Sequence, residues 1–78
     1  MKKLVEAVKS LKTEKEIEDF LRGILTPKEL DEICMRLEIV KKLKQGTPQQ
    51  EIAKLLGVGV ATVTRGSREL KNGRFKYI

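Results

Sequence analysis

The stretch QQEIAKLLGVGVATVTRGSR, residues Gln49–Arg68, decides the fold of this chain because it matches a helix-turn-helix. Such a motif needs a small residue where two helices cross, a glycine that turns the chain with positive φ, and apolar residues that hold the helices at a steep angle. Ala53 supplies the first and Gly57 the second, and the apolar residues are Ile52, Leu56, Val58 and Val63. The spacing predicts a helix-turn-helix, although a plain helical hairpin has similar spacing.

The second helix of this motif is expected to present small and basic side chains outward. No acidic residue occurs from Val58 through Arg68, as a helix in the major groove of DNA requires. Small side chains allow close approach to base edges, while Arg and Thr can bind phosphates or bases. Lys71, Arg74 and Lys76 continue the positive charge and are expected to contact phosphates. The outward residues should include Val60, Ala61, Thr64, Arg65 and Arg68, although simple packing would also explain Val60 and Ala61.

Three capping-box patterns predict helix starts in this chain. In each, a Thr is followed three residues later by Glu or Gln, so that side chains can satisfy free backbone N–H groups. In two of them a proline follows the Thr, at the first helical position, where its missing N–H costs nothing. The pairs are Thr13 with Glu16, Thr26 with Glu29, and Thr47 with Gln50, and the prolines are Pro27 and Pro48.

Apolar residues at helical spacing predict an all-α fold of about five short helices with no confident strand. We expect them at about 4–11, 14–25, 27–45, 48–56 and 60–70, the third ending at Gly46. Cys34 lies beside the apolar stripe of the long helix and is expected to be a small core residue.

The chain is too short to be stable alone without help. A chain of 78 residues buries only about 60% of the surface that it exposes when unfolded. A single Cys cannot form an intrachain disulfide, and with no His the chain cannot assemble a nitrogen/sulfur zinc site. We therefore expect a homo-oligomer without a metal. Enzymatic function is not expected, because histidine, the commonest general acid and base, is absent.

The net charge of +6 lies in the second half of the chain. Residues 1–35 contain seven basic and eight acidic residues, whereas residues 36–78 contain ten basic and three acidic ones. This asymmetry favours a polyanionic partner, either nucleic acid or an anionic membrane surface. No apolar run reaches the length of a membrane span and no signal peptide is recognisable, so we expect a cytoplasmic protein.

Several segments resemble the tryptophan repressor family. They are Leu25–Pro27, Arg36–Val40 and above all Gly57–Ser67, and the resemblance extends from roughly Leu4 to Lys71. The brevity of the chain, its Arg-Leu-Glu run and the end Lys71–Gly73 also resemble the YerC/YecD-type relatives of that family.

The resemblance implies an intertwined homodimer of single-domain chains. Residues 1–45 would form the dimerisation helices, 47–71 the helix-turn-helix and 72–78 a basic tail. Two recognition helices would lie about 34 Å apart and read a palindromic operator. Gln50 and Ala53 replace basic residues of the family, so operator contacts there should differ or be lost. The implied DNA-facing residues are Gln50, Ala53, Gly59, Val60, Ala61, Thr62 and Thr64, to which the charge pattern adds Arg68 and Lys71.

The resemblance also implies L-tryptophan as a candidate corepressor. In the family two arginines sandwich the indole, a threonine helps to hold the carboxylate, and a glycine lets the ring approach. Glu69 replaces the family serine that meets the ligand's ammonium; it would accept this ammonium, or pair with Arg36 or Arg65 and fill the site. Without a ligand, Arg36 would instead pair with Glu32, Arg65 would bind a phosphate and Thr26 would only cap its helix. The implied ligand residues are Thr26, Arg36, Arg65, Gly66 and Glu69.

Three functions are compatible with these observations. The first is a dimeric, sequence-specific transcriptional repressor that binds operator DNA and uses L-tryptophan as corepressor. The second is a YerC/YecD-type DNA-binding regulator that acts without a ligand or answers another molecule. The third, of a different class, is a helical interaction dimer whose basic end binds RNA or an acidic protein.

Overall fold

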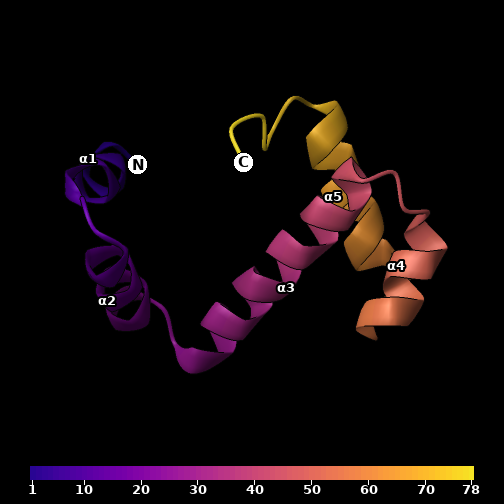
Figure 1. Cartoon of the computed structure of the whole chain (residues 1–78), viewed down its shortest axis with the longest axis horizontal. Helices are drawn as coiled ribbons and strands as arrows, with labels where there is room; N and C mark the ends of the chain where they lie inside the picture. The colour runs from indigo at the N-terminus through magenta and orange to yellow at the C-terminus, as the bar shows by residue number, and fades with distance from the viewer. The chain divides into compact units, whose positions relative to one another are not determined.

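A computed structural model describes residues 1–78 as five α-helices without strands (Figure 1). Residues Met1–Asp31 and Glu32–Ile78 form two compact units. The predicted all-α class and the number of helices are confirmed, and the predicted helix ends agree within two residues. The helices are α1 (Lys2–Ser10), α2 (Glu14–Ile24), α3 (Pro27–Lys44), α4 (Gln49–Leu56) and α5 (Val60–Lys71).

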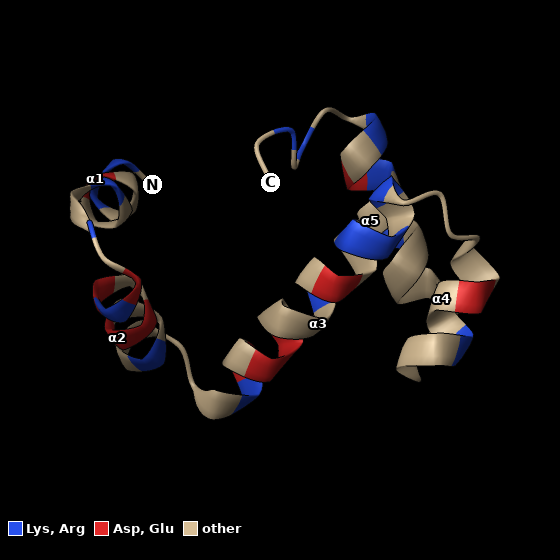
Figure 2. Ribbon diagram, in the orientation of Figure 1, with Lys and Arg blue, Asp and Glu red and all other residues tan.

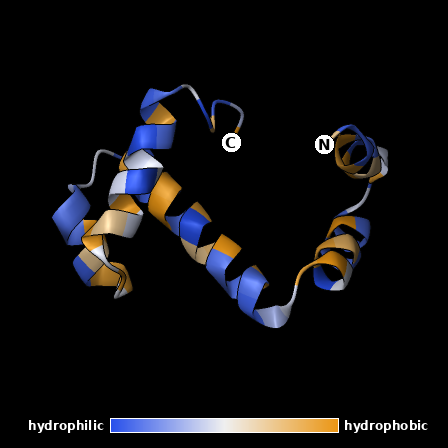
Figure 3. Ribbon diagram, turned by 180° about the vertical axis from the view of Figure 1, so that it is seen from behind, coloured by the Kyte–Doolittle hydropathy of each residue, from blue (hydrophilic) through white to orange (hydrophobic).

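The first unit holds α1 and α2, and neither helix buries a residue within the chain. The predicted cap of α2 is present, since the Thr13 hydroxyl accepts a hydrogen bond from the Glu16 N–H at 3.1 Å. Apolar stripes run along both helices (Figure 3). Several of their large apolar side chains are about half exposed, among them Leu4, Val8 and Ile17. Within the first unit, the apolar faces of α1 and α2 therefore remain largely uncovered.

The capping box at the start of α3 forms as predicted, with Pro27 at the first helical position. The Glu29 N–H donates to the Thr26 hydroxyl at 3.2 Å, and the Thr26 N–H donates to the Glu29 carboxylate at 2.9 Å. Hydrogen bonding by Thr26, first from its backbone and then from its side chain, lowers the pKa of Glu29. A carboxyl group whose pKa is lower in the folded state stabilises the fold at pH values above its unfolded-state pKa. This contribution is lost as the pH falls through the folded-state pKa.

The second unit holds the only buried core, where α4 and α5 contact each other and pack on the C-terminal half of α3. Gly57 ends α4 with φ +66°, a left-handed conformation that glycine adopts without a Cβ clash. The Val58 N–H then donates to the Ala53 carbonyl at 3.0 Å, which closes the turn. The core consists of the predicted Ile52, Ala53 and Val63 together with Ile39, and Leu56 and Val58 pack against it.

The predicted capping box of Thr47 and Gln50 is wrong. The Thr47 N–H donates to the Lys42 carbonyl at 3.1 Å, so this residue completes the end of α3 instead of starting α4. Pro48 consequently takes the N-cap position, without a side-chain hydrogen bond, and α4 begins at Gln49. The Thr47 N–H is therefore already used and does not donate to the Gln50 side chain, as a capping box requires.

The expectation that Cys34 is a core residue is also wrong, because its side chain is exposed. Within α3 only Ile39 and Val40 are buried. The α4–α5 pair covers the C-terminal half of α3, and nothing in the second unit covers the turn that carries Cys34. No helix is long and apolar enough to cross a membrane.

Candidate functional site

The outward face of α5 carries small, hydroxyl and basic side chains, as predicted. Val63 is fully buried and directs the opposite face of the helix into the core. Glu69 is the only acidic residue of α5, and the Lys and Arg residues of the helix lie in its C-terminal part, drawn blue in Figure 2. The helix therefore presents a surface almost free of carboxylates. Its exposed residues are Val60, Ala61, Thr62, Arg65, Arg68 and Lys71, preceded by the exposed N-cap Gly59.

A hydrogen bond that sequence reasoning missed joins the start of α4 to α5. The Thr64 hydroxyl donates to the side-chain oxygen of Gln49 at 2.8 Å, and Thr64 is half-buried rather than fully outward. This contact commits the hydroxyl proton to the protein and leaves only acceptor capacity toward solvent. Thr64 thus helps to fix the angle between the two helices of the motif.

The two positions of α4 implied as DNA-facing differ in their surroundings. Gln50 is exposed, whereas Ala53 is only 7% exposed and belongs to the core. The expectation of a DNA-facing Ala53 is therefore wrong. Its methyl group is enclosed where the helices pack, and a larger side chain would separate them.

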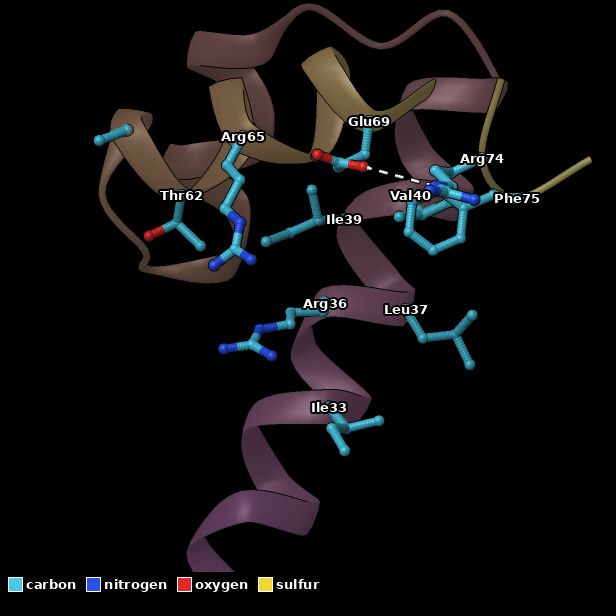
Figure 4. Close-up of a pocket in the computed structure, with 12 residues that line it drawn as sticks. Ile33, Arg36, Leu37, Ile39, Val40, Thr62, Arg65, Glu69, Arg74 and Phe75 are labelled. Atoms are coloured by element: carbon cyan, nitrogen blue, oxygen red, sulfur yellow. Dashed lines mark ion pairs between the residues drawn. The ribbon is translucent and has the colours of Figure 1, made fainter. Parts of the chain in front are cut away.

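A pocket of about 880 Å³ lies between α3, α5 and the segment after α5 (Figure 4). Its walls are mostly apolar, with three arginines and one glutamate at the edges. No group of three His, Cys, Asp or Glu side chains is placed to hold a metal ion. The lining residues are Ile33, Arg36, Leu37, Ile39, Val40, Ala61, Thr62, Arg65, Gly66, Glu69, Arg74 and Phe75.

Arg36 from α3 and Arg65 from α5 both line this pocket, and their guanidiniums extend toward the same region of it (Figure 4). Neither guanidinium has an ion-pair partner, because the only two ion pairs of the chain are Arg22 with Glu18 and Arg74 with Glu69. The pair of Arg36 with Glu32 that would explain Arg36 without a ligand does not form. Two unpaired guanidiniums beside apolar walls can bind a carboxylate and stack on an aromatic ring.

Glu69 pairs with neither Arg36 nor Arg65. Its carboxylate lies 3.9 Å from the Nε of Arg74, which comes from the segment after α5 (Figure 4). Sequence reasoning assigned Arg74 to phosphate contacts and overlooked both this pairing and the contribution of Phe75 to the pocket. The signal that could have indicated them is Lys71-Asn72-Gly73, which is typical of a helix that ends in a reversal at glycine.

The family model of the Trp repressor protein matches residues 1–78, the whole chain. The chain belongs to the Trp repressor family. It is 39% identical over 69 residues to the Trp operon repressor homolog of Vibrio vulnificus strain YJ016, covering 87% of this chain and 68% of the relative. The homolog of Vibrio cholerae serotype O1 is 39% identical over 70 residues, which cover 88% of this chain and 68% of the relative. The Trp operon repressor homolog of Aliivibrio salmonicida is 43% identical over 56 residues, which cover 70% of this chain and 52% of the relative. No solved structure matches the chain significantly.

Membership of the Trp repressor family confirms the resemblance seen in the sequence and makes this chain a Trp repressor-like regulator, from a family of transcription regulators rather than enzymes. Four of the five residues implied as ligand-binding line one pocket, namely Arg36, Arg65, Gly66 and Glu69. Thr26 is in the unit of residues 1–31, where its hydroxyl caps α3.

Gly66 of this Trp repressor-family chain also has a packing role. A Cβ at this position would lie 3.3 Å from Cγ2 of Ile39 and 3.4 Å from Cδ1 of Leu43. A Cβ at position 66 would therefore require the Ile39 and Leu43 side chains to shift by a few tenths of an ångström. The glycine serves the wall of the pocket and the helix crossing together.

Proposed function

We propose that this chain is a DNA-binding repressor whose α5 enters the major groove of an operator. The observation that carries the proposal is the outward face of α5, which has no carboxylate before Glu69, while Val63 on the opposite face packs in the core. Small side chains at its N-terminal end permit close approach to base edges, and the basic residues after them bind phosphates. The proposed DNA-contacting residues are Gln50, Gly59, Val60, Ala61, Thr62, Thr64, Arg68 and Lys71.

The repressor acts as an intertwined homodimer in this proposal. Residues 1–45 supply the dimerisation helices, and the partner covers the apolar faces of α1 and α2 that the first unit leaves exposed. Burial of these faces is the main stabilising contribution available to a chain with so small an internal core. A dimer also presents two copies of α5 to successive major grooves of DNA. In each chain, residues 47–71 form the helix-turn-helix and residues 72–78 form the basic tail.

L-tryptophan is the proposed corepressor. The pocket joins α3 to α5, so a ligand between Arg36 and Arg65 contacts both the helix that supports α5 and α5 itself. Such a ligand favours the one orientation of α5 in which both helices of a dimer fit DNA. The ligand can change the populations of this orientation and of the others only as far as its affinities for them differ.

Selection of bound duplexes from a random DNA pool, run with and without L-tryptophan, tests this function. We expect enrichment of a palindromic sequence whose half-sites lie about one helical turn apart, and stronger enrichment with the ligand. Equal enrichment without L-tryptophan would instead support a YerC/YecD-type regulator. Absence of any enriched sequence at moderate salt would support binding of RNA or an acidic protein through charge alone.

Replacing Lys71 by Ala should weaken binding to all duplexes alike, because this side chain is assigned to a phosphate. The slope of log affinity against log salt should become shallower by about 1, the contribution of one phosphate contact. Fluorescence anisotropy with the selected duplex and a scrambled duplex measures both quantities. Lys15→Ala, an exposed lysine of α2, is the control and should leave the slope unchanged. A loss confined to the selected duplex would contradict the assignment of Lys71.

A further inference from the structure

The segment after α5, residues 73–78 and here called the strap, reverses direction at the end of the helix through a Schellman motif. Gly73 has φ +88°, and its N–H donates to the Leu70 carbonyl at 3.0 Å. The Arg74 N–H donates to the Glu69 carbonyl, also at 3.0 Å, and the side chains of these two residues form the ion pair described above. The strap is therefore attached to the last turn of α5 by both backbone and side-chain contacts.

The strap is also attached to α3. The Lys44 ammonium, at the end of α3, donates hydrogen bonds to the backbone oxygens of Phe75 and Ile78. Val40 lies one helical turn before Lys44 and therefore on the same face of α3. It is only 2% exposed although it is not part of the core cluster, and it lines the pocket together with Phe75 (Figure 4). The strap therefore lies along this face of α3.

Phe75 is the only non-glycine residue of the chain with a positive φ. Its φ of +61° is in the left-handed region, which bulky residues rarely adopt. A residue keeps such a conformation only where its surroundings hold it there. Around Phe75 these surroundings are the Lys44 ammonium at its carbonyl oxygen and the apolar surface of α3 that lines the pocket with it. The backbone conformation thus indicates that the contact between the strap and α3 holds Phe75 in place.

The strap gives α5 a second attachment to α3. The first lies near the middle of α5, where Val63 shares the core cluster with Ile39 and Gly66 closely approaches the same isoleucine. Val63 is the only buried residue of α5, so a helix held there alone could turn about this point. The strap acts at the end of α5, about 12 Å beyond Val63 at 1.5 Å per residue. A second attachment at this distance restricts the direction of the helix.

A change in the direction of α5 moves α4 as well. The two helices contact each other, and the Thr64 hydroxyl donates to the Gln49 side chain at 2.8 Å. The small side chains proposed to contact bases lie at the N-terminal end of α5, opposite the end that carries the strap. In the proposed dimer, the direction of the α4–α5 pair on α3 decides whether both copies of α5 fit successive major grooves.

We propose that the strap sets the orientation of the α4–α5 pair on α3, and that Phe75 and Lys44 are positioning residues for operator recognition. The inference rests on the proposed function, because it assigns to these residues the presentation of α5 to DNA rather than a contact with DNA. Loss of either contact leaves the outward face of α5 unchanged. It lowers the fraction of molecules in which both copies of α5 fit one operator, and the apparent affinity falls by that fraction.

Fluorescence anisotropy of the full-length protein with the selected palindromic duplex and with a scrambled duplex tests the proposal. Phe75→Ala removes the ring without changing the net charge. We expect this variant to bind the selected duplex about tenfold more weakly, as when the competent fraction falls to roughly one-tenth. Its affinity for the scrambled duplex depends on charge and should stay unchanged. Phe75→Leu keeps an apolar side chain on the strap and should recover most of the loss.

Two matched controls separate positioning from direct contact and from charge. Tyr77→Ala removes an aromatic side chain from the same strap that is 98% exposed, and it should change neither affinity. Lys44→Gln should lower the ratio of the two affinities, whereas Lys41→Gln removes the same charge from an exposed position of α3 and should not. Phe75→Ala combined with Lys44→Gln should cost less than the product of the two single effects, because both substitutions release the same strap.

Circular dichroism at 222 nm and sedimentation equilibrium check that each variant is helical and dimeric. If Phe75→Ala does not fold, the comparison of Lys44→Gln with Lys41→Gln decides. An unchanged ratio in Phe75→Ala and Lys44→Gln overturns the inference and leaves the proposed DNA binding intact. Equal losses on the two duplexes also overturn it, because they indicate a general loss of folded protein.

Two other results would count against the strap as a positioning element. A fall in the ratio for Tyr77→Ala overturns the inference, because the strap would then contact DNA itself. Failure of the unmodified protein to prefer the selected duplex contradicts the proposed function, and the inference fails with it. The unmodified protein therefore tests the proposed function, and the variants test the role of the strap.

Discussion

Replacing Ile52 by Ala is expected to lower the free energy of unfolding by about 2–5 kcal/mol. The Ile52 side chain is 0% exposed, at the centre of the only core of the chain, where α4 and α5 meet α3. Its truncation removes buried methyl and methylene groups and leaves a cavity that the surrounding helices cannot fully close. A small domain has roughly 5–15 kcal/mol of stability in total, so this single change removes a large part of it.

Urea unfolding followed by circular dichroism at 222 nm measures this effect, at one fixed protein concentration because dimer stability depends on concentration. Leu55→Ala is the matched control, since it makes a similar truncation in the same helix at a side chain that is 62% exposed. We expect its effect to be below about 1 kcal/mol. Equal losses in the two variants would show that the core does not lie where α4 and α5 cross.

Replacing Ile17 by Lys is expected to dissociate the proposed dimer and to lower operator affinity at least about 100-fold. Ile17 lies on the apolar face of α2, is 46% exposed within the chain, and would be buried against the partner. An unpaired ammonium there is costly to desolvate. A monomer can bind only one half-site of the operator. It therefore loses the gain in affinity from two linked binding sites, which is typically about 10²–10⁴-fold.

Sedimentation equilibrium and fluorescence anisotropy with the selected operator measure the two parts of this prediction. The substitution adds one positive charge, so the expected loss of DNA affinity opposes the direct effect of charge. Glu18→Gln changes the net charge by the same amount on the exposed side of α2 and should leave both the dimer and the affinity intact. A variant Ile17→Lys that stays dimeric would contradict the assignment of α2 to the dimer interface.

The helices and most of their ends were predictable because their signals are local. The capping pairs at Thr13 and Thr26 and the glycine at 57 act within a few residues of themselves, so the sequence around them is sufficient. The capping box at Thr47 failed because the Thr47 N–H already donates to the Lys42 carbonyl at the end of α3. The prediction that Cys34 is buried failed because an apolar stripe shows which face of a helix is suited to burial, but not whether the same chain covers that face.

The candidate ligand site was predictable in part, through resemblance rather than spacing. The structure places Arg36, Arg65, Gly66 and Glu69 around one pocket. It also changes the roles expected for two of them, because Glu69 pairs with Arg74 and Gly66 packs against α3. The hydrogen bonds from Lys44 to the backbone oxygens of Phe75 and Ile78 span more than thirty residues of sequence, and no periodic pattern encodes them.

The sequence by itself determined the all-α class, the helix-turn-helix and the concentration of positive charge after residue 35, because helix periodicity, capping and charge are properties of neighbouring residues. The tertiary structure alone decided which partners the charged groups take. Arg36 and Arg65 have no ion-pair partner, the Glu69 carboxylate lies 3.9 Å from the Nε of Arg74, and the Thr64 hydroxyl donates to Gln49. The physical reason is that ion pairs and hydrogen bonds depend on distances of a few ångströms, and folding sets these distances only after the helices have packed.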